Sequence, residues 1–103
     1  MKNLQKIRLQ LISGKFEFSR HAFRRAVERN ISELEIRQSG EVVEIIESYP
    51  EDKYAPSCLL LGFTKTGRPL HLQVSCLDAP ILKIITLYEP DQARWYNYSQ
   101  RRA

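Results

Sequence analysis

Two histidines, His21 and His71, are the residues of this chain best suited to proton transfer near neutral pH, and they are its only histidines. If the segment that follows His21 is helical, Arg25 lies one turn further and Arg29 about two turns further, on roughly the same face. His71 interrupts an alternating apolar segment and points away from its apolar side. One imidazole as base, a second as acid and an arginine on the phosphate would suffice to cleave an RNA phosphodiester without a metal.

Each residue in the first histidine segment has a second interpretation, which the sequence leaves open. His21 acts in proton transfer, or it bonds a backbone group at the start of a helix. Arg25 holds a phosphate and its developing charge, or it forms a surface ion pair with Glu28. Arg29 is expected to be a structural or phosphate-contacting charge. Two further arginines fall on other sides of the helix and are interpreted as RNA contacts or solvated charge: Arg20 and Arg24.

The second histidine is expected to share a strand face with polar neighbours. A two-residue turn at Thr66 and Gly67 would place Gly62 opposite His71, and the next connection would place Thr86 opposite it, with Tyr88 diagonal. Thr86 and Tyr88 are therefore candidates to bond the phosphate or to orient the imidazole. The alternative is that threonine and tyrosine stand there because they favour strands.

The elements that must position these residues follow from hydrophobic period and capping residues. Helices are expected over residues 4–13, from an N-cap at Ser19 to Arg29, and from a capping box at Ser32 to Gly40, with a left-handed Asn30 between the last two. Residues 16–18 read as a brief extended piece. Strands are expected over residues 42–46, 57–64, 68–76 and 81–88. The expected fold is α+β, with N-terminal helices on one face of a mainly antiparallel four-stranded meander sheet.

The length of the chain predicts one domain over residues 1–103, and its net charge makes that domain basic. Its 16 lysines and arginines against 12 acidic residues leave a net charge of +4, which favours an anionic partner. Residues 94–103 form an aromatic and basic tail in which Arg94 is an RNA-binding candidate. The tail either stacks on bases or is a terminal segment docked by Trp95.

Several classes of function are disfavoured. Cys58 and Cys76 form no CxxC pair and have no histidine at a metal-ligand spacing, so no metal site and no cofactor is predicted. Both are expected to be buried free thiols. The first residues have no signal-peptide core and no stretch could span a bilayer, so we expect a cytoplasmic protein without membrane association.

Four blocks of sequence resemble a family of small bacterial domains of unknown function. They are residues 19–22 with Arg25 and residues 29–32; residues 47–50 with the loop 52–58; residues 67–71; and residues 84–90 ending at Trp95. The resemblance covers about residues 18–95. That family is grouped with RelE-like and barnase-like (BECR) ribonuclease toxins and is often found beside MqsA-type zinc-finger antitoxins. Asn30 stands where the family commonly has glycine, and asparagine tolerates the same backbone conformation.

The resemblance implies a RelE/BECR-like fold and a toxin of a bacterial toxin–antitoxin pair that acts as a metal-independent endoribonuclease. A base would take the 2′-hydroxyl proton, the oxygen would attack the adjacent phosphorus, and an acid would protonate the leaving 5′-oxygen. The expected partners are RNA and an antitoxin protein. The alternative is a non-catalytic RNA- or protein-binding module of the same fold.

Overall fold

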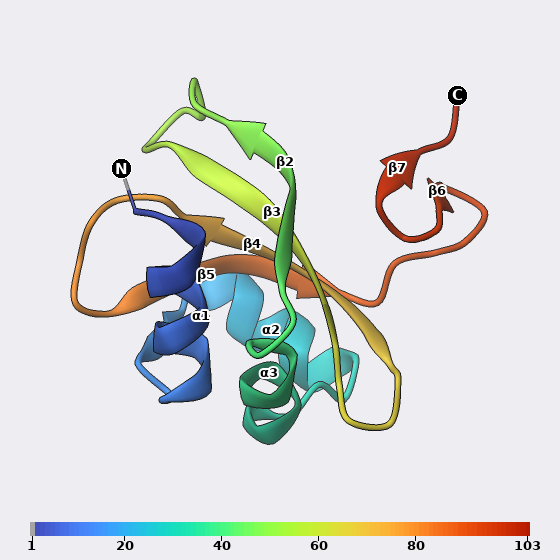
Figure 1. Cartoon of the computed structure of the whole chain (residues 1–103), viewed down its shortest axis with the longest axis horizontal. Helices are drawn as coiled ribbons and strands as arrows, with labels where there is room; N and C mark the ends of the chain where they lie inside the picture. The colour runs from blue at the N-terminus through green and yellow to red at the C-terminus, as the bar shows by residue number, and fades with distance from the viewer. Residues whose placement is uncertain (1) are drawn as a thin grey trace.

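The computed structural model describes residues 2–103 as three helices, a five-stranded sheet and a small two-stranded hairpin (Figure 1). The helices are α1 (Leu4–Ile12), α2 (Arg20–Glu28) and α3 (Glu33–Ser39). The strands are β1 (Phe16–Phe18), β2 (Glu44–Tyr49), β3 (Ser57–Phe63), β4 (Pro69–Ser75), β5 (Leu82–Tyr88), β6 (Trp95–Tyr96) and β7 (Gln100–Arg101). Both an α+β class and the three expected helices are confirmed.

Local capping explains where the helices begin. The side chains of Asn3, Ser19 and Ser32 each accept a hydrogen bond from a backbone N–H in the first turn of α1, α2 and α3. At Ser32 the reciprocal bond from its own N–H to the Glu35 side chain completes a capping box. After α2, Asn30 takes a φ of 54°, the left-handed conformation expected of it.

The sheet has five strands in the order β1-β5-β4-β3-β2, so the expectation of four strands is wrong. The meander from β2 to β5 is antiparallel as expected, but β1 adds a parallel edge beside β5, where Phe16 pairs with Leu82 and Phe18 with Ile84. The first long strand begins at Glu44 rather than at Val42. The reason is that the backbone after α3 first makes a turn, in which the N–H of Val42 bonds the carbonyl of Ser39.

The turn between β3 and β4 is one residue longer than predicted, and this changes the register. Phe63 pairs with Pro69, and Gly67 at φ 85° closes a loop in which the N–H of Thr64 bonds the carbonyl of Arg68. His71 therefore stands opposite Leu61 and not opposite Gly62. Because side chains alternate along a strand, one residue of slip exchanges the two faces of β3. Leu59 and Leu61 therefore lie on the face that carries His71 and do not belong to the core cluster.

A bulge in β5 shifts the register in which β5 pairs with β4. The pairing steps from Gln73–Thr86 to Val74–Ile84, which leaves Ile85 without a partner on β4. The extra residue changes the phase of the strand, so Leu82 and Ile84 face the core together with Leu87. Ile81 and Ile85 do not belong to the core cluster.

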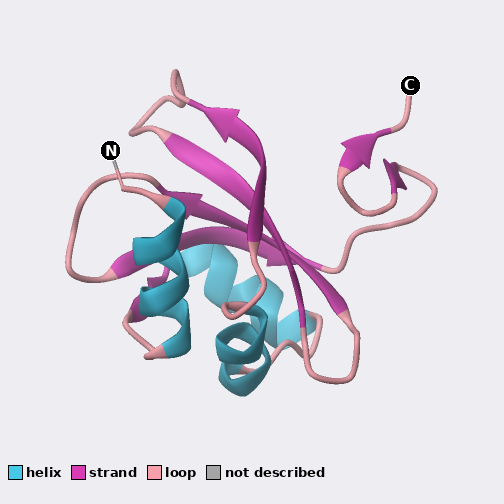
Figure 2. Cartoon of the chain, in the orientation of Figure 1, coloured by secondary structure: helices cyan, strands magenta, loops and turns pink. Residues whose placement is uncertain are grey.

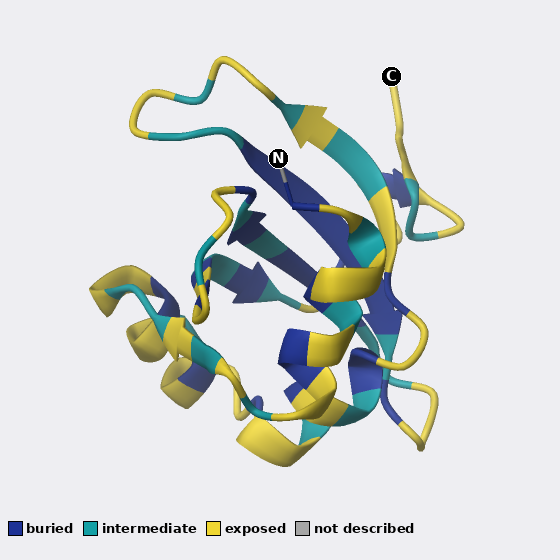
Figure 3. Cartoon of the chain, turned by 60° about the vertical axis from the view of Figure 1, so that its left-hand side comes forward, coloured by how far each residue is buried: buried dark blue, intermediate teal, exposed yellow. Residues whose placement is uncertain are grey.

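All three helices pack on one face of the sheet (Figure 2). Their apolar side chains join the inward residues of the strands in one core, and burial is concentrated in the central strands and the inner sides of the helices (Figure 3). Both cysteines are free and buried as expected, and burial beside Cys76 raises the pKa of Cys58 to about 12. No helix within residues 2–103 has the length and apolar character needed to cross a bilayer.

The chain then crosses to the other face of the sheet, where β6 and β7 form a hairpin near the end of the chain (Figure 1). Trp95 pairs with Arg101 and Tyr96 with Gln100 in this hairpin. Trp95 is buried and its ring packs edge-on against His71, with 4.5 Å between ring centroids. The docking of the tail by Trp95, one of the two interpretations above, is thus seen in the structure.

Candidate functional site

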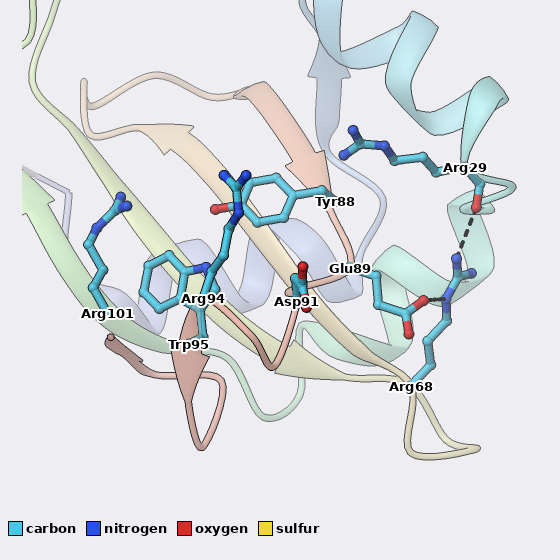
Figure 4. Close-up of a pocket in the computed structure, with 8 residues that line it drawn as sticks. All are labelled: Arg29, Arg68, Tyr88, Glu89, Asp91, Arg94, Trp95 and Arg101. Carbon is cyan, nitrogen blue, oxygen red and sulfur yellow. Dashed lines mark hydrogen bonds and ion pairs between the residues drawn. The ribbon is translucent and has the colours of Figure 1, made fainter. Parts of the chain in front are cut away.

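A cleft of about 690 Å³ opens where the end of β5, the end of α2 and the C-terminal hairpin meet (Figure 4). Four of the eight side chains that line it are arginines, two are acidic and two are aromatic. They are Arg29, Arg68, Arg94, Arg101, Glu89, Asp91, Tyr88 and Trp95.

Arg68 is fully engaged and has a structural role at one end of the cleft. Its guanidinium donates to Glu35 and Glu89 and also to the carbonyls of Arg29 and Asn30. These bonds connect the start of β4 to the end of α2 and the start of α3. Hydrogen bonding to Glu89 is the largest cause that raises the pKa of Arg68. All three guanidinium nitrogens of Arg68 therefore donate to other parts of the protein, and Arg68 anchors the wall of the cleft.

Arg29 and Arg94 are the two arginines of the cleft whose side chains make no hydrogen bond or ion pair with residues 2–103. Both side chains are exposed. Arg29 extends from the end of α2 in the direction of Tyr88, and Arg94 rises from the loop before β6 (Figure 4). Two guanidinium groups without acidic partners leave planar sets of donors available to an anion.

His71 and Tyr88 stand directly opposite each other on β4 and β5 and form the polar wall beside this cleft. The Nδ1 atom of His71 is 3.2 Å from the hydroxyl of Tyr88, and its Nε2 atom is 2.6 Å from the backbone carbonyl of Tyr98. A carbonyl only accepts, so Nε2 carries a proton and donates to Tyr98. In the neutral ring Nδ1 is then the acceptor, and the Tyr88 hydroxyl donates to it.

The charge state of this pair follows from its burial. His71 is fully buried, and loss of solvation, which disfavours the imidazolium, is the largest cause that lowers its pKa. Burial likewise raises the pKa of Tyr88, against the opposing positive charges of Arg101 and Arg29. The pair is therefore neutral at neutral pH, with one proton held between two heteroatoms.

An ion pair between Glu47 and Arg101 holds the hairpin over the sheet. The Nε and Nη2 atoms of Arg101 donate to the two carboxylate oxygens of Glu47 at 2.9 and 3.1 Å, and the Tyr49 hydroxyl donates to the same carboxylate. Burial would raise the pKa of Glu47, but these hydrogen bonds outweigh it and lower the pKa. Arg101 also lies over the Trp95 ring at 4.7 Å.

The structure brings four of the nine predicted site residues together, since His71 contacts Tyr88, and Tyr88, Arg29 and Arg94 line the cleft. His21 is exposed at the start of α2, its ring has no hydrogen bond with residues 2–103, and it does not line the cleft. Arg25 forms an ion pair with Glu28 at 3.2 Å. Thr86 faces Gln73 across the sheet and not His71, because the pairing of β4 with β5 is shifted by two residues from the predicted register, one of them at the bulge in β5. Two more predicted residues lie on the exposed surface of α2 and outside the cleft: Arg20 and Arg24.

Sequence reasoning missed Arg68 and Glu47 as residues of this region. Each is distant in sequence from the side chains that it joins, so no local spacing could connect them. Gly67-Arg68 and Glu47 did fall within the blocks that carried the family resemblance, which was the only available signal.

A comparison with known families covers part of this site. A family described as Domain of unknown function (DUF4258) matches residues 18–89, more than half of the chain. This chain belongs to that family. Searches of curated proteins and of solved structures give no significant match. The matched residues contain His71, Tyr88, Arg29 and Arg68, whereas Arg94, Trp95 and Arg101 come from the loop and hairpin that follow them.

The chemistry that this arrangement offers is anion binding beside a proton-relaying pair. Arg29 and Arg94 supply unpaired donors, and Tyr88 supplies a hydroxyl whose proton is held against His71. Within residues 2–103 no group of three or more histidine, cysteine or acidic side chains is placed to hold a metal ion. The site is therefore best described as a cationic cleft with an aromatic wall.

Proposed function

We propose that this protein binds RNA in the cationic cleft and acts as the toxin of a bacterial toxin–antitoxin pair, with a RelE/BECR-like fold. The observation that carries the proposal is the pair of unpaired arginines, Arg29 and Arg94, beside Tyr88 in one cleft. Arginine binds phosphate bidentately, and an unpaired arginine does so without first breaking an internal ion pair. The net charge of +4 favours the same polyanionic partner.

Cleavage at this cleft would use the Tyr88–His71 pair. The Tyr88 oxygen takes the proton of the RNA 2′-hydroxyl while its own proton moves to Nδ1 of His71. The 2′-oxygen forms a bond to the adjacent phosphorus, the bond to the 5′-oxygen breaks, and that oxygen takes a proton from water. The hydroxide that remains then takes a proton from Tyr88, which recovers its own from Nδ1 of His71, so water and the neutral pair are restored. The imidazolium formed is supported by the Tyr98 carbonyl and by the nearby charge of Glu47. Arg29 and Arg94 hold the phosphate as its charge develops.

The second candidate is an RNA- or protein-binding module that does not cleave. Two observations favour it: both nitrogens of His71 have partners within the protein, and His21 lies outside the cleft. An antitoxin segment with acidic side chains would use the same arginines.

Binding and cleavage are tested separately. For binding, we expect a fluorescent 2′-O-methyl oligoribonucleotide, which resists 2′-hydroxyl attack, to bind wild type in an anisotropy titration. The double variant Arg29→Ala, Arg94→Ala is expected to weaken binding by at least about tenfold, because two charge-assisted contacts are lost. Lys15→Ala is the control, since Lys15 is exposed in the turn between α1 and β1 and lines no part of the cleft. An equal loss of binding free energy for each charge removed in the two proteins would show that only net charge matters, which contradicts the cleft.

For cleavage, unmodified RNA in EDTA, and separately ribosome-bound message in a magnesium buffer that keeps the ribosome intact, are incubated with wild type and with Tyr88→Phe, His71→Gln and His21→Ala variants. Activity lost in the first two variants and kept in the third supports the Tyr88–His71 pair. Activity lost only in His21→Ala would assign the chemistry elsewhere. Binding without any cleavage would establish the second candidate, and growth arrest on expression without a partner would separate a toxin from an inert module.

A further inference from the structure

The sheet face that carries His71 continues past the cleft into a second hollow of about 480 Å³. It lies between the end of β2, the loop that follows β2, the middle of β4 and the hairpin, and it is lined by Tyr49, Pro50, Glu51, Asp52, Gln73 and Arg101. Arg101 lines this hollow and the cationic cleft as well. The two hollows are therefore adjacent along one surface.

Strand geometry gives the direction of that surface. Gln73 lies two residues after His71 on β4, so the two side chains emerge on the same face about 7 Å apart. Across the sheet Gln73 pairs with Leu59, which itself pairs with Glu47. An RNA strand that is bound beside Tyr88 and continues along the sheet toward β2 passes over the cross-strand row of Gln73, Leu59 and Glu47.

Gln73 is held in one orientation by its neighbours. Its Nε2 atom donates to the Asp52 carboxylate at 3.3 Å and to the Ser57 hydroxyl at 3.2 Å, and Ser57 donates to the same carboxylate at 2.6 Å. A carboxylate only accepts, so the amide nitrogen must face Asp52 and Oε1 must face away. Oε1 accepts no hydrogen bond from residues 2–103 and is not among the buried atoms left without a partner, so it is open to solvent.

We propose that this hollow binds the base of the nucleotide next to the bound phosphate, and that it prefers bases with an exocyclic amino group. The inference rests on the proposed RNA binding. The Tyr49 ring supplies a stacking face, and Oε1 of Gln73 beside the Asp52 carboxylate presents hydrogen-bond acceptors only. The amino groups of adenine and cytosine satisfy such acceptors. Uracil presents a single N–H that is flanked by two carbonyl oxygens. The acceptors of the hollow repel these two oxygens.

The test compares binding of 2′-O-methyl oligo(A), oligo(C) and oligo(U) of equal length by anisotropy at one salt concentration. Wild type is expected to bind oligo(A) and oligo(C) about five- to tenfold more tightly than oligo(U), the effect of one hydrogen bond gained against one repelled. Gln73→Ala is expected to remove this difference. Ser48→Ala is the matched control and should keep it, because Ser48 is exposed, has no side-chain hydrogen bond with residues 2–103 and does not line the hollow.

Stacking is tested by a second pair of variants that does not depend on Gln73. Tyr49→Leu is expected to weaken binding of oligo(A) and oligo(C) by at least about fivefold, whereas Tyr49→Phe keeps the ring and stays within about twofold of wild type. Circular dichroism of each variant checks that the fold is retained. If Gln73→Ala unfolds, the comparison of Tyr49→Leu with Tyr49→Phe decides whether a base stacks in the hollow.

The outcomes separate this inference from the proposed function. Equal affinity of wild type for all three oligonucleotides, or a preference that persists in Gln73→Ala, overturns the base site while the cleft stands. No binding of any oligonucleotide to wild type overturns the RNA-binding function itself.

Discussion

At the scale of single residues, His71 shows how a buried polar group can be both structural and chemical. Its two nitrogens are satisfied by Tyr88 and by the Tyr98 carbonyl, so a fully buried imidazole causes no unpaired group. The same two bonds align a hydroxyl at the edge of a cationic cleft. The neutral form is the stable one because burial disfavours the charged ring.

This burial predicts how stability depends on pH. The folded-state pKa of His71 is lowered from its ordinary 6.5, so the unfolded chain binds the proton more readily than the folded one. Stability is therefore full above about pH 6.5 and decreases as the pH falls toward the folded-state pKa. The temperature at the midpoint of thermal unfolding should therefore decrease when the pH is lowered from 7.5 to 5.5.

The His71→Gln variant provides the control for that measurement. Its amide can donate to Tyr98 and accept from Tyr88 without titrating, so its unfolding midpoint should vary less over the same range. Glu35 and Glu47, whose pKa values are lowered, affect stability only at lower pH, below their ordinary 4.5. Equal pH dependence of the variant and wild type would contradict the assigned burial of His71.

At the scale of elements, the β6–β7 hairpin determines what the site presents to solvent. It places Trp95 on His71, the Tyr98 carbonyl on Nε2 and Arg101 on Glu47. Asn97 and Tyr98 both have left-handed φ values, 51° and 61°, which asparagine tolerates but which are unfavourable for a bulky tyrosine. The contacts of the hairpin with the sheet must offset that cost. The accessibility of His71 therefore depends on a segment outside the matched family residues 18–89.

Removing the indole tests this dependence. Trp95→Ala is expected to lower the unfolding midpoint by several degrees and to let diethyl pyrocarbonate modify a second histidine, because Trp95 covers His71. In wild type only the exposed His21 should react quickly. Tyr96→Ala is the control, since Tyr96 is more than half exposed, and it should leave His71 protected. If His71 stays unreactive in folded Trp95→Ala, another element must cover it.

At the scale of the whole molecule, charge is divided between paired and unpaired arginines. Arg68 and Arg101 are held by Glu35, Glu89 and Glu47 and stabilise the walls of the cleft. Arg29 and Arg94 remain available. The helices cover one face of the sheet, and the hairpin lies over the other face beside the two hollows (Figure 1).

This division predicts the salt dependence of RNA binding. The logarithm of the binding constant should fall linearly with the logarithm of salt concentration, by about 0.7 for each phosphate neutralised on a single strand. Arg94→Ala should reduce that slope by about 0.7, and Lys15→Ala should leave it unchanged. Titrations at four salt concentrations measure both slopes. A slope unchanged in Arg94→Ala would remove this residue from the phosphate contacts.

The elements themselves were predictable because their signals are local. Ser19 and Ser32 cap helices within three residues of themselves, and Asn30 takes its left-handed conformation from its own side chain. The meander of long strands follows from apolar runs separated by turns. His71 and Tyr88 could be named as candidate site residues from the sequence, because each lies in a strand that the sequence pattern predicts.

Only the tertiary structure determined the pairing register of the strands and which distant side chains meet in the cleft. A loop one residue longer at Gly67 and an extra residue at Ile85 changed which side chains face His71, and no local pattern specifies either. Tyr88, Arg29 and Arg94 meet because a strand end, a helix end and a hairpin are packed together, while His21 stays on the exposed surface of α2. Local interactions act over a few residues along the chain, so sequence determines the elements. Side chains tens of residues apart are joined only by the packing of the core, which depends on all elements at once.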